Sequence, residues 1–182
     1  MRTRIDLFTM MKDEGLTGLG VEVGVMCGTF SAQILRAWTG TLFCVDSWRQ
    51  RDDYPEIANV PNSQHLDALV KTYMVTNEYG DRCNILKMSS IEAAKRFQDR
   101  ELDFVYIDAN HSFYGCSTDL EWWWCKVKQG GIVAGHDYHN EKREWGQCGV
   151  KEAVENFHRK HKFPIDSINV INEADPTWWV RV

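Results

Sequence analysis

Ionisable residues follow two apolar runs that predict β-strands in the middle of the chain. Asp108 ends the run at 102–108, and His136 and Asp137 end the run at 130–137. The ends of neighbouring strands lie about 5 Å apart, so these three side chains can converge on one point. Carboxylates and imidazoles at one point can bind a cation or move a proton. A structural alternative stays open, in which the two aspartates only cap the helices that follow.

A second group of residues surrounds the segment VEVGVMCGTFS, at 21–31. Glu22 ends an apolar strand, and Gly24 and Gly28 lie between that strand and a helix. Glycine lets the backbone approach a ligand closely, and free N–H groups at a helix start bind a carboxylate or phosphate. Asp46 ends the next strand, where an acidic residue typically binds ribose hydroxyls. Together these features favour a cofactor that contains adenosine.

The spacing of the turn separates two kinds of cofactor. It reads E-x-G-x-x-x-G, whereas NAD-binding proteins carry G-x-G-x-x-G, and Met26 stands where their middle glycine would be. That glycine makes room for the pyrophosphate of a dinucleotide. A cofactor without a pyrophosphate is therefore favoured, and an NAD(P)-dependent oxidoreductase is the less favoured alternative.

Strands that alternate with helices must position these residues. The predicted strands are 19–23, 41–46, 83–88, 102–108 and 130–137, each followed by a helical pattern, and then 163–171 and 177–182. The alternation predicts right-handed βαβ units, and the short link between the last two strands requires an antiparallel pair. We expect an α/β fold with a doubly wound, mostly parallel sheet of seven strands. Only the last strand is antiparallel, and it lies between strands five and six.

The helices and loops add three expectations. In the helix at 63–74, an apolar face is formed by Leu66, Leu69, Val70 and Tyr73, the pattern of an amphipathic helix. In the helix after 102–108, Asp119 and Trp122 share the face opposite the core stripe, and an exposed Trp122 would mark a partner surface. The polar loop at 49–62 is long and follows Asp46, which favours a lid.

Composition limits the class of protein. The chain has 182 residues, 43% hydrophobic and 26% charged, which suits one domain over 1–182 with a sizeable core. The net charge of −5 argues against a nucleic-acid binder. No apolar run can span a bilayer, and the start does not resemble a signal peptide. The six cysteines form no zinc spacing. We expect a cytoplasmic protein with a small-molecule partner and no membrane or nucleic-acid partner, and a homo-oligomer stays open.

Several blocks of sequence carry a resemblance to a known family. They are GVEVGVMCGTFS, LFCVDSW, DFVYIDANHSFYGCSTDLEWW and KQGGIVAGHDY, together with the closing hairpin. With these blocks the chain resembles class I S-adenosylmethionine-dependent methyltransferases over 18–182, closest to macrocin-type O-methyltransferases and cephalosporin hydroxylase-like proteins. The resemblance implies a Rossmann-like class I methyltransferase fold and methyl transfer to an oxygen of a small hydroxylated molecule. A cofactor-binding protein without turnover is the alternative, because cofactor motifs report binding and not catalysis.

The resemblance also implies which residues contact S-adenosylmethionine. Glu22 and Gly24 would face the amino and carboxylate ends of the methionine moiety, and Asp46 would bind the ribose hydroxyls. Ser47 and Trp48 would lie beside the adenosine. The remaining members of the expected set are Gly28 in the turn, Ser89 or Ser90 beside the adenine, and Asp108 where the methyl group is presented.

A divalent cation is implied by the metal-dependent relatives, in which the equivalent positions hold Mg²⁺. The resemblance places Mg²⁺ or another divalent cation at Asp108, His136 and Asp137. The cation would bind a substrate hydroxyl, lower its pKa and orient its oxygen. The sequence departs from the family at His136, where many relatives carry a carboxylate, and imidazole suits Zn, Mn, Fe or Ni better than Mg.

The sequence departs from the family a second time, at the position of the general base. Asn110 stands where some relatives carry a carboxylate that is proposed as the base, and an amide cannot accept the proton. His111 and His139 are the remaining candidates, because an unperturbed histidine titrates near pH 6.5. With Asp108 they form the expected catalytic set.

Overall fold

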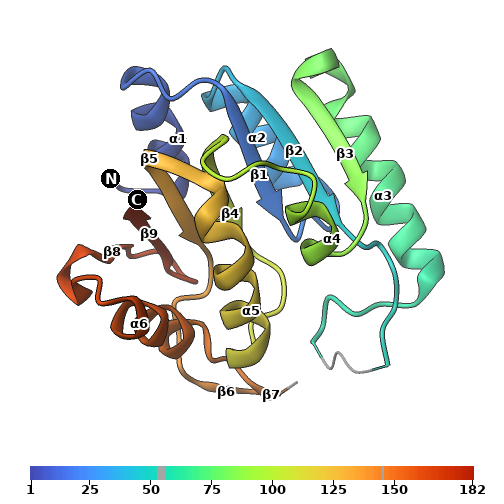
Figure 1. The fold of residues 1–182 in the computed structure, drawn as a ribbon. Coiled ribbons are helices and arrows are strands. Elements are labelled where there is room, and N and C mark those ends of the chain that lie inside the picture. Colours follow the sequence, from blue (N-terminus) through green and yellow to red (C-terminus); the bar gives the residue numbers. More distant parts are fainter. Residues whose placement is uncertain (53–55, 145) are drawn as a thin grey trace.

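The computed structural model describes residues 1–52, 56–144 and 146–182 of the chain. Its central feature is a seven-stranded sheet in the order β3-β2-β1-β4-β5-β9-β8 (Figure 1). The strands are β1 (Leu19–Val23), β2 (Thr41–Asp46), β3 (Cys83–Lys87), β4 (Leu102–Ile107), β5 (Val127–Gly135), β8 (Asn169–Ile171) and β9 (Thr177–Arg181). A separate two-stranded ribbon, which the sequence did not predict, pairs β6 (Lys142–Arg143) with β7 (Gly146–Gln147).

Helices cover both faces of this sheet, as expected for a doubly wound fold (Figure 1). One face packs against α1 (Arg4–Asp13), α2 (Thr29–Ala37) and α3 (Asn62–Thr76). The other packs against α4 (Ser90–Ala94), α5 (Phe113–Trp123) and α6 (Val150–His161). Short 3₁₀ segments are η1 (Asn77–Arg82), η2 (Trp124–Lys126) and η3 (Ile165–Ser167). Within the described residues, no helix combines the length and apolar character that crossing a membrane requires.

The predicted strand order and directions are confirmed. β1 pairs in parallel with β2 and β4, so the chain reverses its winding direction at β1. β9 pairs antiparallel with both β5 and β8, which leaves β9 as the one reversed strand of this sheet. Ligands bind at the carboxyl ends of parallel strands beside such a reversal. Two strands differ in their bounds from the prediction by more than one residue: β5 runs over Val127–Gly135 instead of 130–137, and β8 begins only at Asn169 because Pro164 and η3 precede it.

Helix α1 was not predicted from the sequence. Its residues Leu7, Phe8 and Met11 are fully buried, and Phe8 makes edge-to-face contacts with Phe30 and Phe104. The helix is polar on average, so its short apolar stripe gave a weak signal. Arg4 in its first turn places its guanidinium 4.0 Å from the ring centre of Phe30.

Most of the apolar face predicted for α3 is turned toward the solvent, and only Leu69 of its four residues packs against the core. Leu66, Val70 and Tyr73 are each at least half exposed, whereas the buried side of the helix carries small and polar residues. Thr72 on the buried side lies so close to Gly28 that a Cβ there would be 2.9 Å from the threonine Cα. A helix that approaches a glycine turn this closely has no room for large side chains, which explains the reversed pattern.

These two helices allow a matched test of the fold. We expect Phe8→Ala to lower the free energy of unfolding by about 3–5 kcal/mol, because it opens a cavity in the core. Leu66→Ala removes an exposed apolar side chain from α3 and should change it by less than about 0.5 kcal/mol. Urea unfolding followed by circular dichroism measures both values. Equal losses for the two variants would contradict the assignment of these faces.

Candidate active site

A cavity of about 670 Å³ opens at the carboxyl ends of β1, β2 and β4. This size lies within the usual range for small-molecule sites. Eight residues of the predicted site line it: Glu22, Gly24, Asp46, Ser47, Ser89, Ser90, Asp108 and His111. Five predicted residues do not line it: Gly28, Trp48, His136, Asp137 and His139. The cavity therefore gathers most of the expected cofactor set in one place.

The floor of the cavity is the glycine turn after β1. Gly24 has φ +89°, and a Cβ at this position would lie 1.9 Å from the carbonyl oxygen of Asp108. The Gly24 amide donates to the Val45 carbonyl oxygen at 2.9 Å, and the Asp108 amide donates to the Val23 carbonyl oxygen at 2.8 Å. Only glycine meets both the dihedral angle and the close approach.

Asp46 holds this turn from the second strand. Its Oδ2 accepts hydrogen bonds from the amides of Val25 and Met26, both at 3.0 Å, and its Oδ1 accepts from the amide of Trp48 at 2.8 Å. A carboxylate offers about four acceptor positions. Described residues use three of them, which leaves one for a ligand hydroxyl.

Trp48 and Gly28 support the turn and do not line the cavity. Trp48 is buried, and its Nε1–H donates to the Met26 carbonyl oxygen at 2.7 Å. Gly28 has φ +72° at the start of α2, where it packs against Thr72. The side chain of Thr72 donates a further hydrogen bond to Met26 at 3.2 Å. Both predicted residues thus have a supporting position in this structure.

Glu22 is almost completely buried between β1 and α2. Burial raises the pKa of its carboxyl to about 8, a hydrogen bond from the Ser31 hydroxyl opposes this rise, and the charge of nearby Asp108 adds to it. Glu22 is therefore mostly a neutral acid at pH 7. A neutral carboxyl can accept and donate hydrogen bonds at the wall of the cavity.

The opposite end of the cavity is formed by α4 and α5. Ser89 caps α4, and its Oγ accepts from the Glu92 amide at 3.3 Å. The Ser90 hydroxyl donates to Asp119 and accepts from Trp123 Nε1 at 2.8 Å. Asp119 was predicted on the outward face of α5, but it is buried, and burial raises its pKa to about 6. The error arose because Asp119 turns toward the cavity instead of the solvent.

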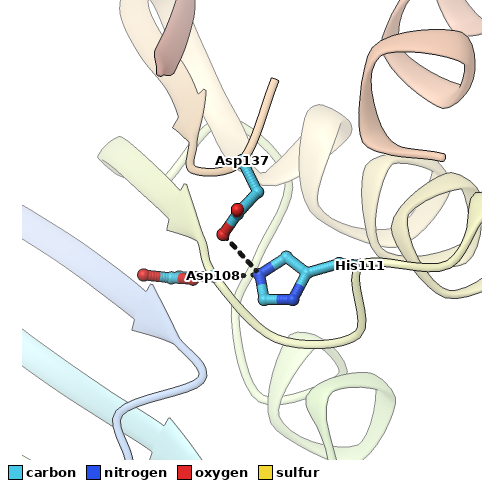
Figure 2. Close-up of side chains that lie close together, drawn as sticks. All are labelled: Asp108, His111 and Asp137. Carbon is cyan, nitrogen blue, oxygen red and sulfur yellow. Dashed lines mark hydrogen bonds and ion pairs between the residues drawn. The ribbon is translucent and has the colours of Figure 1, made fainter. Parts of the chain in front are cut away.

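Two aspartates and a histidine converge where β4 and β5 end (Figure 2). His111 Nε2 lies 3.1 Å from Asp108 Oδ1 and 3.3 Å from Asp137 Oδ2. Ligand atoms of the three residues all lie within 4.8 Å of one another. Neither aspartate caps the next helix, because Ser112 caps α5 and Gly149 precedes α6. The predicted convergence of Asp108 and Asp137 is thus present, with His111 between them.

His136 and His139 have different surroundings from His111. His136 Nδ1 lies 3.0 Å from Asp137 Oδ2 and 3.8 Å from Asp108 Oδ1, at the border of the cluster. His139 Nε2 lies 3.9 Å from Asp175 Oδ1. His139 belongs to a second group with Asp137 and Asp175, which also have ligand atoms within 4.8 Å of one another. His111 is therefore the histidine that combines contact with both aspartates and a place on the cavity wall.

The protonation state of His111 is set by two carboxylates, those of Asp108 and Glu56. Burial alone would lower its pKa, but hydrogen bonds to Asp108 and Glu56 and the charges of both raise the pKa to about 11. Glu56 Oε2 lies 2.7 Å from His111 Nδ1. At neutral pH, in the absence of a cation, the ring is an imidazolium that can donate a proton but not accept one. This state argues against His111 as a general base.

Glu56 and His65 belong to the site but were not predicted from the sequence. Glu56 lies in the polar loop after β2, of which 53–55 fall outside the described residues. The sequence indicated a role for Glu56 only through its place as an acidic residue in the loop that was expected to be a lid. His65 lines the cavity and is 6% exposed, and neither ring nitrogen has a partner within the described residues. The apolar pattern of α3 predicted that the opposite face of the helix is buried, so it gave no indication that His65 is buried.

Comparison with known proteins identifies the type of domain. Residues 21–138 match the family model described as a methyltransferase domain. This segment runs from β1 through the end of β5 and contains the glycine turn, Asp46 and the Asp108–His111–Asp137 cluster. A comparison with curated proteins found no match.

Solved structures with a similar fold include three methyltransferases. An O-methyltransferase from Bacillus cereus in complex with SAH has 13% identity and a TM-score of 0.63, covering 98% of this chain and 80% of that one. The O-methyltransferase TomG from Streptomyces achromogenes, involved in tomaymycin synthesis and bound to SAM, has 12% identity and a TM-score of 0.64, covering 98% and 79%. A didemethyltoxoflavin N1-methyltransferase from Burkholderia thailandensis has 10% identity and a TM-score of 0.62, covering 99% and 78%. At these identities the likeness establishes the fold.

The buried carboxyl of Glu22 makes a prediction about pH and stability. Its pKa is about 8 in the folded chain and near the ordinary 4.5 when unfolded. Between these values the unfolded state releases the proton and the folded state keeps it, so this group lowers stability as pH rises. Glu22→Gln removes the effect, and the variant should gain on the native chain by up to about 1.4 kcal/mol per pH unit. Urea unfolding of the native chain and of Glu22→Gln at pH 5 and pH 8 measures this difference. An equal change in unfolding free energy between the two pH values for both proteins would contradict the raised pKa of Glu22.

Proposed function

Because the chain belongs to the methyltransferase domain family and is a methyltransferase that uses S-adenosylmethionine, we propose that it methylates an oxygen of a small hydroxylated molecule. The observation that supports an oxygen acceptor is the cluster of Asp108, His111 and Asp137 beside the cavity. Carboxylates and an imidazole at this position can orient a hydroxyl and hold a cation that favours its ionisation. The family assignment sets aside the NAD(P)-dependent alternative.

The proposed cofactor contacts follow the strand ends around the cavity. Glu22 and Gly24 would meet the amino acid portion, and the free acceptor position of Asp46 would take a ribose hydroxyl. Ser90 and Asp119 would border the adenine, where a buried carboxylate can accept a hydrogen bond from an amine. Ser47 and Ser89 line the same wall of the cavity. With these contacts, the methyl group would face Asp108.

The chain's own residues would act mainly by positioning. When bound, S-adenosylmethionine would supply an electrophilic methyl group on a sulfonium, which transfers directly to the substrate oxygen with S-adenosylhomocysteine as the leaving group. The carboxylate of Asp108 lines the cavity and can accept a hydrogen bond from the substrate hydroxyl, which fixes the direction of the oxygen lone pair. Holding the two reacting atoms in line accounts for much of the rate increase in such a displacement.

The donor set of the cluster fits a divalent cation. Asp108 and Asp137 offer carboxylate oxygens, and His111 offers Nε2, all within 4.8 Å of one another. A mixed set of oxygens and one imidazole nitrogen suits Mn, Fe, Co or Zn better than Mg. When bound, such a cation would lower the pKa of the acceptor hydroxyl. The proposed histidine ligand is His111, with His136 beside it, whereas the sequence predicted His136.

Methyl transfer can be tested directly with small probes. The protein would be incubated with S-adenosylmethionine, Mn²⁺ and a panel of catechols, phenols and hexoses, with the corresponding aromatic amines as comparators. We expect methylated hydroxyl compounds by mass spectrometry and no methylated amines. Methylation of the amines alone would contradict the oxygen acceptor. Tight binding of S-adenosylhomocysteine without any transfer would favour the binding-protein alternative.

The cofactor assignment predicts the effect of changing Asp46. Asp46→Ala should weaken the binding of S-adenosylhomocysteine by about 1–3 kcal/mol, because a hydrogen bond to the ribose is lost and the turn is less well held. Isothermal titration calorimetry measures the affinity, and NAD should give no binding signal with either protein. Asp67→Ala, an exposed acid on α3, is the control and should leave the affinity unchanged. Unchanged affinity in Asp46→Ala would remove this residue from the cofactor site.

The proposed role of Asp108 at the acceptor side of the cavity leads to a different prediction. Asp108→Asn should abolish transfer to any hydroxyl compound that the native protein methylates, yet leave the affinity for S-adenosylhomocysteine within about threefold, because other residues hold the cofactor. Removal of divalent cations with EDTA should give the same result. Transfer is followed as release of S-adenosylhomocysteine, and affinity by calorimetry. Transfer that survives EDTA would contradict the cation.

A further inference from the structure

The geometry points to Glu56 as the positioning residue of the cation site, which orients His111 so that Nε2 faces Asp108 and Asp137. This inference rests on the proposed divalent cation and extends it to a residue of the loop after β2. Glu56 is 7% exposed and lies 55 positions before His111 in the chain. A carboxylate of a polar loop is rarely buried to this extent unless it is paired.

Two hydrogen bonds join Glu56 to His111. Glu56 Oε1 accepts from the backbone amide of His111, and Oε2 contacts the ring Nδ1, both at 2.7 Å. One carboxylate thus fixes both the backbone and the ring of the same histidine. The ring then has a single orientation, with Nε2 at 3.1 Å from Asp108 Oδ1 and 3.3 Å from Asp137 Oδ2.

The hydrogen bond to Glu56 also selects the form of the ring that binds a cation. A carboxylate at Nδ1 keeps a proton on that nitrogen, which leaves Nε2 as the atom with a free lone pair once a cation replaces its proton. Histidine ligands of metal ions commonly donate their other N–H to a carboxylate in this way, and loss of that partner weakens metal binding 10–100-fold. Glu56 is the carboxylate that would accept from the other ring N–H of His111.

The position of Glu56 links the loop to the cation. The loop contributes Ala58 and Asn59 to the cavity wall. It is braced internally, since the Arg51 amide donates to Asn59 Oδ1 at 2.8 Å. Because a cation needs the oriented ring and the ring needs Glu56, cation binding and this placement of the loop stabilise each other. Such coupling is reciprocal by thermodynamic necessity.

The test measures Mn²⁺ affinity by electron paramagnetic resonance, and the form of the His111 ring by ¹⁵N-edited NMR of the protein loaded with Zn²⁺, which is diamagnetic. We expect Glu56→Ala to weaken Mn²⁺ binding 10–100-fold and to lose the single Nδ1–H form of the ring. Glu56→Gln keeps one oxygen that can accept from Nδ1–H but loses the acceptor for the His111 amide, so it should keep the ring form and weaken Mn²⁺ binding less than Glu56→Ala does. Asp52→Ala, an exposed acid of the same loop, should behave as the native protein.

Further variants separate the outcomes. His111→Ala should lose Mn²⁺ binding as well, and circular dichroism checks that every variant is folded. Mn²⁺ binding by Glu56→Ala at native affinity, with binding lost in His111→Ala, would overturn the role of Glu56. No Mn²⁺ binding by the native protein would overturn it too. Calorimetry with S-adenosylhomocysteine tests the cofactor site independently, because Glu56 does not line the cavity.

Discussion

The carboxyl ends of β1 and β4 meet at a backbone contact that leaves no space for a side chain. A Cβ on Gly24 would overlap the carbonyl group of Asp108, so the turn after β1 rests directly on the residue that begins the acid cluster. Asp46 fixes the same turn from β2 through the amides of Val25 and Met26. The cofactor side and the acceptor side of the cavity are therefore parts of one rigid unit. A change in the turn moves Asp108, and with it the position of the hydroxyl that it would orient.

Negative charge around the cavity is the second constraint, and the chain balances it in three ways. Glu22 is held as a neutral acid by burial. Asp46 is balanced by three backbone amides. Asp108 and Glu56 share the imidazolium of His111. The amides that hold Asp46 carry no net charge, so they leave its carboxylate able to attract a positively charged ligand. The sulfonium of S-adenosylmethionine is such a ligand, and the proposed divalent cation would be a second one, beside His111.

The strands were predictable because each is a short apolar run bounded by turn residues, and their order followed from the alternation with helices. The glycine turn and Asp46 were found for the same reason, since they lie at positions that strand order defines. Helix α1 was not predicted because only three of its ten residues are buried, which gives too weak a helical periodicity of apolar residues. The face of α3 was misread because its contact with Gly28 requires small residues, and this tertiary constraint is stronger than the apolar pattern.

His111 was predicted as a base, but its surroundings favour the proposed role of a cation ligand. The reason lies outside any local sequence pattern. The sheet supplies Asp108 and Asp137 at fixed positions, whereas the loop after β2 supplies Glu56, which decides how the histidine ring is turned. Sequence periodicity carries no information on a hydrogen bond between a polar loop and a strand end 55 positions away. Loops vary more readily than the sheet that they cover. The carboxylates can therefore be inferred from the fold, while the proposed nitrogen ligand, and the cation that it would favour, depend on the loop.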